Sequence, residues 1–388
     1  MASHHQDKTK SSAGDEVIPP STPSEMNTSP IDLGHIEVMQ ILNEHGEVDQ
    51  GLEPSLSDER LLEVYRAMIL ARTFDQRMLT MQRQGRMGTF APNTGQEACT
   101  VGQVVPLTKD DWYSPSYRSF GAQIMRGWPM EHLMRLWAGF HDGFPPPENV
   151  NDLPFSIVIG SHVLPAVGLG MGMNYKKKND CVVVNFGDGA SSQGAVSEAL
   201  NFAAVYKAPV VFVCENNGWA ISTPTAKQTA NEVIAARGVA YGIPSIRVDG
   251  NDILAMVFAV DEAAKRARNG DGPTFIEAIT YRMSLHTTAD DPTVYRDEQE
   301  VLPWGKRCPI TRFEIYLKNK NLLTNDSIQE ITESCEQEVI AARDKFYSMP
   351  SANPGEIFDH LYEIMPEELS QQRDEYRKRL DDKGVDYE

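Results

Sequence analysis

The chain has little cysteine and no long apolar run. Its five cysteines are an odd number, lie scattered along 388 residues and form no Cys-x-x-Cys pair. This usage gives no disulfide or zinc framework and is typical of a reducing compartment, so we expect a cytoplasmic protein. No apolar run approaches the roughly 20 residues that a helix needs to span a bilayer, so we expect no membrane association.

Positively charged residues are also fewer than negatively charged ones. Lys and Arg total 36 against 55 Asp and Glu, which gives a net charge of −19 at pH 7. A negative excess of this size disfavours nucleic acid and anionic membrane surfaces, so neither is expected as a partner. Hydrophobic residues at 41% are ordinary for a globular protein, and the length allows a large core.

The first 30 residues lack the apolar segment of a secretory signal. They carry acids but almost no arginine, unlike a mitochondrial transit peptide. They are polar and rich in Ser, Thr, Pro and His, a composition that does not build a packed core. We therefore predict that residues 1–30 form a disordered N-terminal extension.

Beyond this extension, helical and strand patterns alternate. Ser57 can cap a helix whose apolar residues recur at helical spacing to about Gln84. Further helices are expected over 129–139, 160–175, 191–207, 230–241 and 253–269, and strands over 181–186, 209–214, 245–249 and 274–281. This alternation predicts an α/β fold with a doubly wound parallel sheet over residues 31–310. Residues 311–388 are charged and helical in pattern, which predicts a helical C-terminal appendage.

Two short polar motifs follow two of the predicted strands. Gly187-Asp188-Gly189 comes after the apolar run 181–186, and Asn216-Asn217 comes after the run 209–214. With a helix between them, the two strands place their carboxyl ends at one edge of the sheet. Asp188 and Asn217 then direct oxygen atoms toward one point, which suits Mg²⁺. Each motif alone is ordinary turn chemistry; the pair at this spacing predicts a metal site.

This pair of motifs resembles that of thiamine-diphosphate enzymes. The resemblance implies that Asp188 and Asn217, with the backbone carbonyl of Trp219, hold the Mg²⁺ that bridges the cofactor's diphosphate. It also implies that Gly189 and Ala190 offer backbone N–H groups to the diphosphate, because glycine lets the backbone approach closely.

A longer set of motifs narrows the resemblance and covers roughly residues 55–345. They lie at residues 83–86, 95–98, 117–118, 220–224, 246–252 and 286–292. Together they resemble the alpha subunit of the thiamine-diphosphate-dependent decarboxylating component of 2-oxo acid dehydrogenase complexes. Bacterial members of that family are cytoplasmic, in line with the cysteine usage.

The resemblance assigns further roles. It implies that Tyr117 and Arg118 contact the diphosphate, Arg118 as a charge-assisted donor. Ile157 and Ile159 belong to the segment that lines the cofactor between its two rings. His286 is expected on a mobile loop, in contact with the diphosphate and assisting the later transfer step. The resemblance also implies that the same loop is ordered by Asp290, Asp291, Tyr295 and Arg296.

Some positions depart from the family pattern. Residues 90–94 contain no histidine, so a histidine role there is not transferred. Glu215 stands where other relatives have an arginine that binds phosphate, so that contact is not expected. His162 replaces a common glutamine and is assigned no chemistry. Asp290-Asp291-Pro292 replaces the serine-rich loop of animal relatives, so kinase control is not implied.

The family activity implies partners. The chain contains the diphosphate-binding kind of domain, and no companion pyrimidine-binding domain is evident. We therefore expect a beta subunit that supplies the glutamate facing the pyrimidine, in an assembly of two alpha and two beta chains. A lipoyl-bearing acyltransferase is expected to accept the acyl group. The front half and residues 290–296 resemble bacterial pyruvate enzymes, whereas residues 216–225 resemble branched-chain enzymes. We therefore expect pyruvate as the 2-oxo acid, with the branched-chain acid 3-methyl-2-oxobutanoate as the alternative.

Two functions of other classes deserve comparison. A nucleotide-binding oxidoreductase would have a related fold, but no Gly-x-Gly-x-x-Gly follows a predicted strand. A catalytically silent cofactor-binding scaffold subunit is the other alternative. The presence of Asp188, Asn217 and His286 favours an enzyme over such a scaffold, and lack of Mg²⁺-dependent cofactor binding would reverse that preference.

Overall fold

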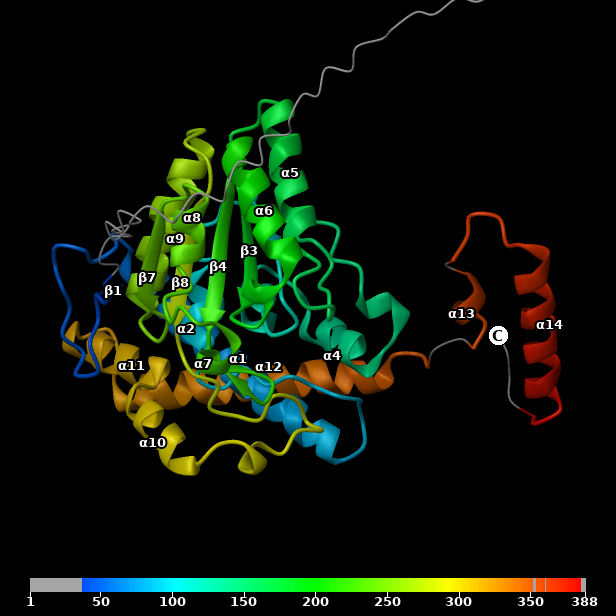
Figure 1. Cartoon of the computed structure of the whole chain (residues 1–388). Coiled ribbons are helices and arrows are strands. Elements are labelled where there is room, and N and C mark those ends of the chain that lie inside the picture. Colours follow the sequence, from blue (N-terminus) through cyan, green and yellow to red (C-terminus); the bar gives the residue numbers. More distant parts are fainter. Residues whose placement is uncertain (1–36, 352–353, 360, 385–388) are drawn as a thin grey trace, which may run out of the picture. The chain divides into compact units, whose positions relative to one another are not determined.

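The computed structural model describes residues 37–351, 354–359 and 361–384. Among them, six parallel strands form one sheet in the order β1-β7-β8-β4-β3-β2 (Figure 1). The strands are β1 (Val38–Met39), β2 (Trp112–Ser114), β3 (Val182–Gly187), β4 (Val210–Asn216), β7 (Ser245–Asp249) and β8 (Thr274–Ile279). The predicted N-terminal extension, residues 1–30, lies outside the described residues.

Helices cover both faces of this sheet, which confirms the predicted α/β fold. Successive side chains of a strand point to opposite faces, and the apolar runs of β3 and β4 are buried on both. Val182, Val184 and Phe186 pack with α5 (Val163–Tyr175) and α6 (Gly194–Val205). Val183 and Val211 pack on the other side with α9 (Ile253–Arg268), beside α2 (Glu97–Gly102).

A group of long helices extends this core. Ser57 caps α1 (Asp58–Arg83) as predicted, since its side chain accepts a hydrogen bond from the Arg60 N–H. α11 (Pro309–Asn319) buries Phe313 against the first half of α1, and α12 (Asn325–Ser348) buries Val339 beside its second half and α4 (Met130–Ala138). The first two helices of the predicted appendage therefore share the core of the main body.

The remaining elements are short. They are α3 (Phe120–Met125), β5 (Trp219–Ala220), β6 (Thr223–Pro224), α7 (Thr225–Gln228), α8 (Ala236–Ala240), α10 (Glu298–Lys306), α13 (Glu356–Asp359), α14 (Glu367–Asp381) and 3-10 turns over His141–Gly143, Ala190–Ser192 and Pro292–Val294. α13 and α14 contact each other through Phe358 and Tyr376. Among the described residues, no helix combines the length and apolar character that crossing a bilayer requires.

Two predicted helices are shorter in the structure. The expected helix over 230–241 is reduced to α8, because the Asn231 side chain accepts from the Val233 N–H and the Glu277 carboxylate accepts from the Ala235 N–H. These bonds hold residues 231–235 in turns. The expected helix over 191–207 is divided into the 3-10 turn Ala190–Ser192 and α6, because Gln193 between them is extended.

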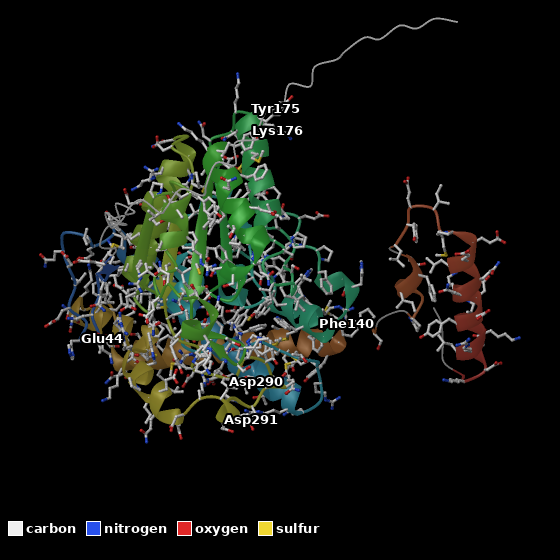
Figure 2. All side chains as sticks on the ribbon, in the orientation of Figure 1. Glu44, Phe140, Tyr175, Lys176, Asp290 and Asp291 are labelled. Carbon is white, nitrogen blue, oxygen red and sulfur yellow. The ribbon has the colours of Figure 1, made fainter. Side chains whose placement is uncertain are left out.

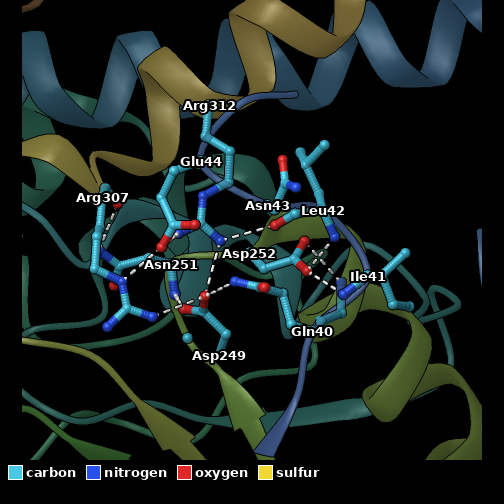
Figure 3. A network of polar contacts seen from close by, with 12 residues as sticks. Gln40, Ile41, Leu42, Asn43, Glu44, Asp249, Asn251, Asp252, Arg307 and Arg312 are labelled. Atoms are coloured by element: carbon cyan, nitrogen blue, oxygen red, sulfur yellow. Dashed lines mark hydrogen bonds and ion pairs between the residues drawn. The ribbon is translucent and has the colours of Figure 1, made fainter. Parts of the chain in front are cut away.

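A buried polar network joins the segment around β1 to Arg307 and to α11 (Figure 3). The Arg312 guanidinium of α11 donates to Asp249 Oδ2 and to the Leu42 carbonyl, each at 2.9 Å. Arg307 reaches the same carboxylate at 3.2 Å. The Asp252 carboxylate caps α9 and accepts from the Ile41 and Leu42 N–H groups. This network fastens the first described segment to the carboxyl end of β7.

Candidate cofactor and metal site

The two polar motifs meet at the carboxyl edge of the sheet. β3 and β4 pair with Gly187 opposite Glu215, so Asp188 and Asn217 leave the two strands side by side. Both residues line one cavity. The same cavity is lined by most of the other residues that the sequence singled out: Tyr117, Arg118, Ile159, Gly189, Ala190, Trp219 and His286. Asn216 does not line it, since its amide donates to Glu277 instead.

Asp188 contributes the one carboxylate of the proposed metal ligands. The residue is 1% exposed, and burial raises the pKa of its carboxyl to about 6, although hydrogen bonds from Thr225 and the backbone oppose the shift. The Thr225 hydroxyl lies 3.2 Å from Asp188 Oδ2. A carboxylate buried with so few donors is poorly compensated, which favours its pairing with a cation.

Asn217 and Trp219 add neutral oxygen atoms. The Trp219 N–H donates to Asn217 Oδ1 at 3.3 Å, and Asn217 Nδ2 donates to Gln96 Oε1 at 3.0 Å. A carboxylate, an amide and a carbonyl are hard donors of the kind that Mg²⁺ binds, with phosphate and water completing the shell. Among the described residues, no cluster of three His, Cys, Asp or Glu side chains offers another metal site. The donor chemistry therefore fits Mg²⁺ at this edge.

Gly189 lies against the β5–β6 hairpin. A Cβ at this position would stand 2.8 Å from Ala220 Cβ, closer than carbon atoms approach, so the segment admits no side chain. Ala190 begins the 3-10 turn, where the first N–H groups have no partner within the helix. This is the geometry expected for a backbone segment that approaches an anion.

Two guanidinium groups stand beside the cavity. Arg118 is 4% exposed and donates to the carbonyls of Pro92 and His286. Arg282 is fully buried and donates to the carbonyls of Trp219 and Ile221 at 3.3 and 2.7 Å. Ile221 has a φ of 56°, which is rare for a β-branched residue. Two buried cations beside the Asp188 carboxylate make the region attractive to a dianion together with its cation.

His286 lies between these two arginines. Its Nδ1 is 3.3 Å from Arg118 Nη2 and from Arg282 Nη1. Guanidinium nitrogens only donate, so Nδ1 accepts and the ring proton resides on Nε2. Burial, together with the two guanidinium charges, lowers the pKa of His286 to about 4. The imidazole is therefore neutral at pH 7, with an Nε2–H that can donate to a ligand.

The loop that carries His286 is held by its own polar residues. The His286 N–H donates to Asp290 Oδ2 at 2.7 Å, and the Tyr295 hydroxyl donates to the same oxygen at 2.5 Å. Arg296 donates to three carbonyls of residues 282–284, and Asp291 caps the 3-10 turn that follows. Figure 2 labels Asp290 and Asp291, which lie on the side toward which the strand β4 arrow points in Figure 1.

Only one side chain of the segment 157–159 lines the cavity. Ile159 lines the cavity and is 43% exposed, whereas Ile157 does not line it and is 62% exposed. Val158 between them is 69% exposed. The structure therefore brings Ile159 to the other site residues and leaves the predicted Ile157 facing solvent.

Sequence reasoning passed over several residues at the site. Glu215 lines the cavity, accepts from Asn185 at 2.6 Å, and burial raises its pKa to about 7. A carboxylate inside an apolar strand was the available signal. His162 also lines the cavity, and its Nε2 pairs with the Asn185 carbonyl at 2.7 Å. Arg282, at the end of an apolar strand, carried a similar signal, whereas nothing local pointed to Gln96.

Comparisons with known proteins find relatives over most of the chain. A family model described as "Dehydrogenase E1 component" matches residues 65–355. The chain is 44% identical to "Pyruvate dehydrogenase E1 component subunit alpha" of Acholeplasma laidlawii over 340 residues, covering 86% of this chain and 97% of that protein. It is 41% identical to the protein of the same name from Staphylococcus aureus (strain Mu50 / ATCC 700699) over 345 residues, covering 88% and 93%.

Proposed function

The chain belongs to the dehydrogenase E1 component family, and we propose that it is the alpha subunit of a pyruvate dehydrogenase. Such a subunit takes part in the oxidative decarboxylation of pyruvate and the reductive acetylation of a lipoyl partner. The observation that carries the proposal is one cavity lined by Asp188, Asn217 and Trp219 on one side and by Arg118 and His286 on another.

The cavity residues would divide the work of holding the cofactor. Asp188, the Asn217 amide oxygen and the Trp219 carbonyl would hold Mg²⁺, while Arg118 and the Gly189–Ala190 backbone would bind diphosphate oxygens. Thiamine diphosphate supplies a thiazolium ring that accepts the electrons released when a 2-oxo acid loses CO₂. Neutral His286, with its proton on Nε2, would donate a hydrogen bond without adding a third positive charge.

Half of the active site is expected from a partner. The apolar residues Val158 and Ile221 are 69% and 56% exposed near the cavity, where a second protein surface would cover them. We propose that a beta subunit covers this edge and supplies the glutamate for the pyrimidine ring, in an assembly of two alpha and two beta chains. A lipoyl-bearing acyltransferase would then approach the completed site.

Pyruvate is favoured over branched-chain 2-oxo acids by the names of the relatives quoted above. The test is the reduction of an artificial electron acceptor by this chain purified with its beta partner, with thiamine diphosphate and Mg²⁺ present. We expect pyruvate to be turned over faster than 3-methyl-2-oxobutanoate. The reverse preference would replace the substrate in this proposal, and no turnover of either would favour a silent scaffold subunit.

A further inference from the structure

The orientation of the Asn217 side chain decides whether it can bind a cation. An asparagine amide has an oxygen at one end and an NH₂ group at the other, and a half-turn of the amide exchanges them. Only the oxygen is a ligand for Mg²⁺. Something in the structure must therefore keep the amide from turning.

One fixed donor settles the amide orientation. The backbone N–H of Trp219 can only donate, and it lies 3.3 Å from one end of the Asn217 amide. That end must be Oδ1, so the other end is Nδ2. Nδ2 lies 3.0 Å from the Gln96 side chain, and Gln96 must therefore present its oxygen. This backbone N–H therefore identifies which end of each amide is the oxygen.

Hydrogen bonds hold the Gln96 backbone in place. The residue is fully buried and directly precedes α2. Its N–H donates to the Asn93 carbonyl at 2.9 Å, and its own carbonyl accepts from the Thr100 N–H at 3.1 Å. Its backbone is therefore fixed on both sides, which limits where its side-chain oxygen can go.

The other end of the Gln96 amide has no partner. Gln96 Nε2 is buried without a hydrogen-bond acceptor. A buried N–H group without a partner costs about 1–3 kcal/mol, so this glutamine does little for the stability of the fold. The contribution of the Gln96 side chain therefore comes from Oε1, which accepts a hydrogen bond from Asn217.

We propose that Gln96 is a positioning residue that locks the Asn217 amide with its oxygen available to the cation. The inference rests on the metal site proposed above. Without the Gln96 oxygen, Nδ2 loses its partner and only the longer hydrogen bond from the Trp219 N–H holds the amide, so its NH₂ group turns toward the cation more readily. Substitution of a residue that orients a metal ligand in this way typically lowers metal affinity about 10- to 100-fold.

The test measures cation affinity in the complex of this chain with its beta partner. Mn²⁺ replaces Mg²⁺, thiamine diphosphate is present, and free Mn²⁺ is followed by electron paramagnetic resonance. Gln96→Leu removes the acceptor, whereas Gln96→Glu keeps an acceptor in its place. Gln123→Leu is the matched control, because Gln123 is also buried with an unpartnered Nε2, whereas the Asn217 amide donates to Gln96.

We expect about tenfold or greater loss of Mn²⁺ affinity in Gln96→Leu, with kcat at saturating Mn²⁺ largely retained. Gln96→Glu and Gln123→Leu should stay near the wild-type affinity. A second measurement uses Asn217→Asp, because either oxygen of a carboxylate can bind the cation. In that background Gln96→Leu should cause no further loss.

Equal Mn²⁺ affinity in the wild type and Gln96→Leu would overturn the inference. So would an undiminished effect of Gln96→Leu in the Asn217→Asp background, since that result indicates general distortion of the site. No Mn²⁺ binding by the wild-type complex would instead overturn the proposed metal site, and the inference with it. Thermal unfolding of each variant establishes that it is folded.

Discussion

At the residue scale, burial sets the charge state of the groups that line the cavity. The Asp188 carboxyl has its pKa raised to about 6 and His286 has its pKa lowered to about 4, in both cases mainly because burial disfavours the charged form. At pH 7 the site without ligand therefore holds two guanidinium charges, from Arg118 and Arg282, a mostly ionised Asp188 carboxylate and a neutral imidazole. This balance suits the arrival of a diphosphate with its cation.

The ionisation of His286 can be tested directly. The neutral imidazole is the form that reacts with diethylpyrocarbonate, and an ordinary histidine loses reactivity below about pH 6.5. We expect His286 in the cofactor-free chain to react down to about pH 5, since its pKa is about 4. Mass spectrometry of the modified peptides measures this, with the same histidine in the urea-unfolded chain as reference.

The same shift affects stability with a defined sign. Between pH 6.5 and 4 the unfolded chain binds a proton at His286 that the folded chain does not. The contribution of this group to stability is therefore complete above pH 6.5 and is lost as the pH falls toward 4. A His286 modification profile that is the same in the folded and the unfolded chain would contradict the lowered pKa.

Gly189 offers a second test at this scale. In Gly189→Ala the new methyl group would collide with Ala220 at 2.8 Å, and overpacking of this kind costs about 1–3 kcal/mol. Because Ala220 adjoins Trp219, we expect cofactor affinity to fall by about tenfold, measured by quenching of tryptophan fluorescence.

The matched control is Gly194→Ala in the first turn of α6, where nothing lies within 4 Å of the added Cβ. This change should leave cofactor binding unaltered and stabilise the fold by about 0.4–1 kcal/mol. Equal affinity for the cofactor in Gly189→Ala and the wild type would show that the hairpin accommodates the methyl group.

The sequence predicted the site residues that share a strand–helix–strand unit better than those that meet across the fold. Asp188 and Asn217 follow strands that pair directly, so their meeting follows from the connection alone. Gln96 contacts Asn217 across 121 positions of the chain, and no local pattern encodes such a contact. Glu215 likewise accepts from Gln103, which lies 112 positions away in the chain.

At the scale of elements, the buried network around Asp249 joins β1, β7 and α11. Removing one partner of a buried ion pair leaves a charge without compensation and costs about 3–5 kcal/mol. We expect Arg312→Met to destabilise the chain by about 3 kcal/mol, near the lower bound because Arg307 and Gln40 still contact the Asp249 carboxylate. Chemical unfolding measures the difference.

Arg343→Met in α12 is the control for Arg312→Met. Arg343 pairs with Asp344 on the solvent side of α12 at 2.6 Å, and exposed pairs contribute about 0–1 kcal/mol. A loss no larger in Arg312→Met than in Arg343→Met would show that the buried network does not fasten β1 and α11 to the sheet.

Element boundaries show where sequence patterns suffice. The helix predicted over 57–84 is α1, because its apolar spacing and its Ser57 cap are both local. The helix predicted over 230–241 is mostly turn, because the Glu277 carboxylate from β8 accepts the Ala235 N–H. That acceptor comes from another part of the chain, and helical spacing alone does not indicate it.

At the scale of the whole molecule, we expect the chain to work together with a partner subunit. The cavity offers groups for a diphosphate and its cation, whereas apolar side chains such as Val158 and Ile221 stand exposed near it. We expect this chain alone to show no pyruvate turnover, and a 2:2 assembly to form when the beta subunit is added. Light scattering coupled to gel filtration measures the assembly; activity of this chain by itself would contradict the half-site account.

The cofactor and metal site is tested by the affinity of the alpha–beta complex for thiamine diphosphate, measured with and without Mg²⁺ in the wild type and in Asp188→Ala. We expect tight binding only with Mg²⁺, and a loss of about a hundredfold in Asp188→Ala, equivalent to roughly 2.7 kcal/mol. Binding that is independent of Mg²⁺, or equal in the two proteins, would contradict a metal-bridged cofactor at Asp188.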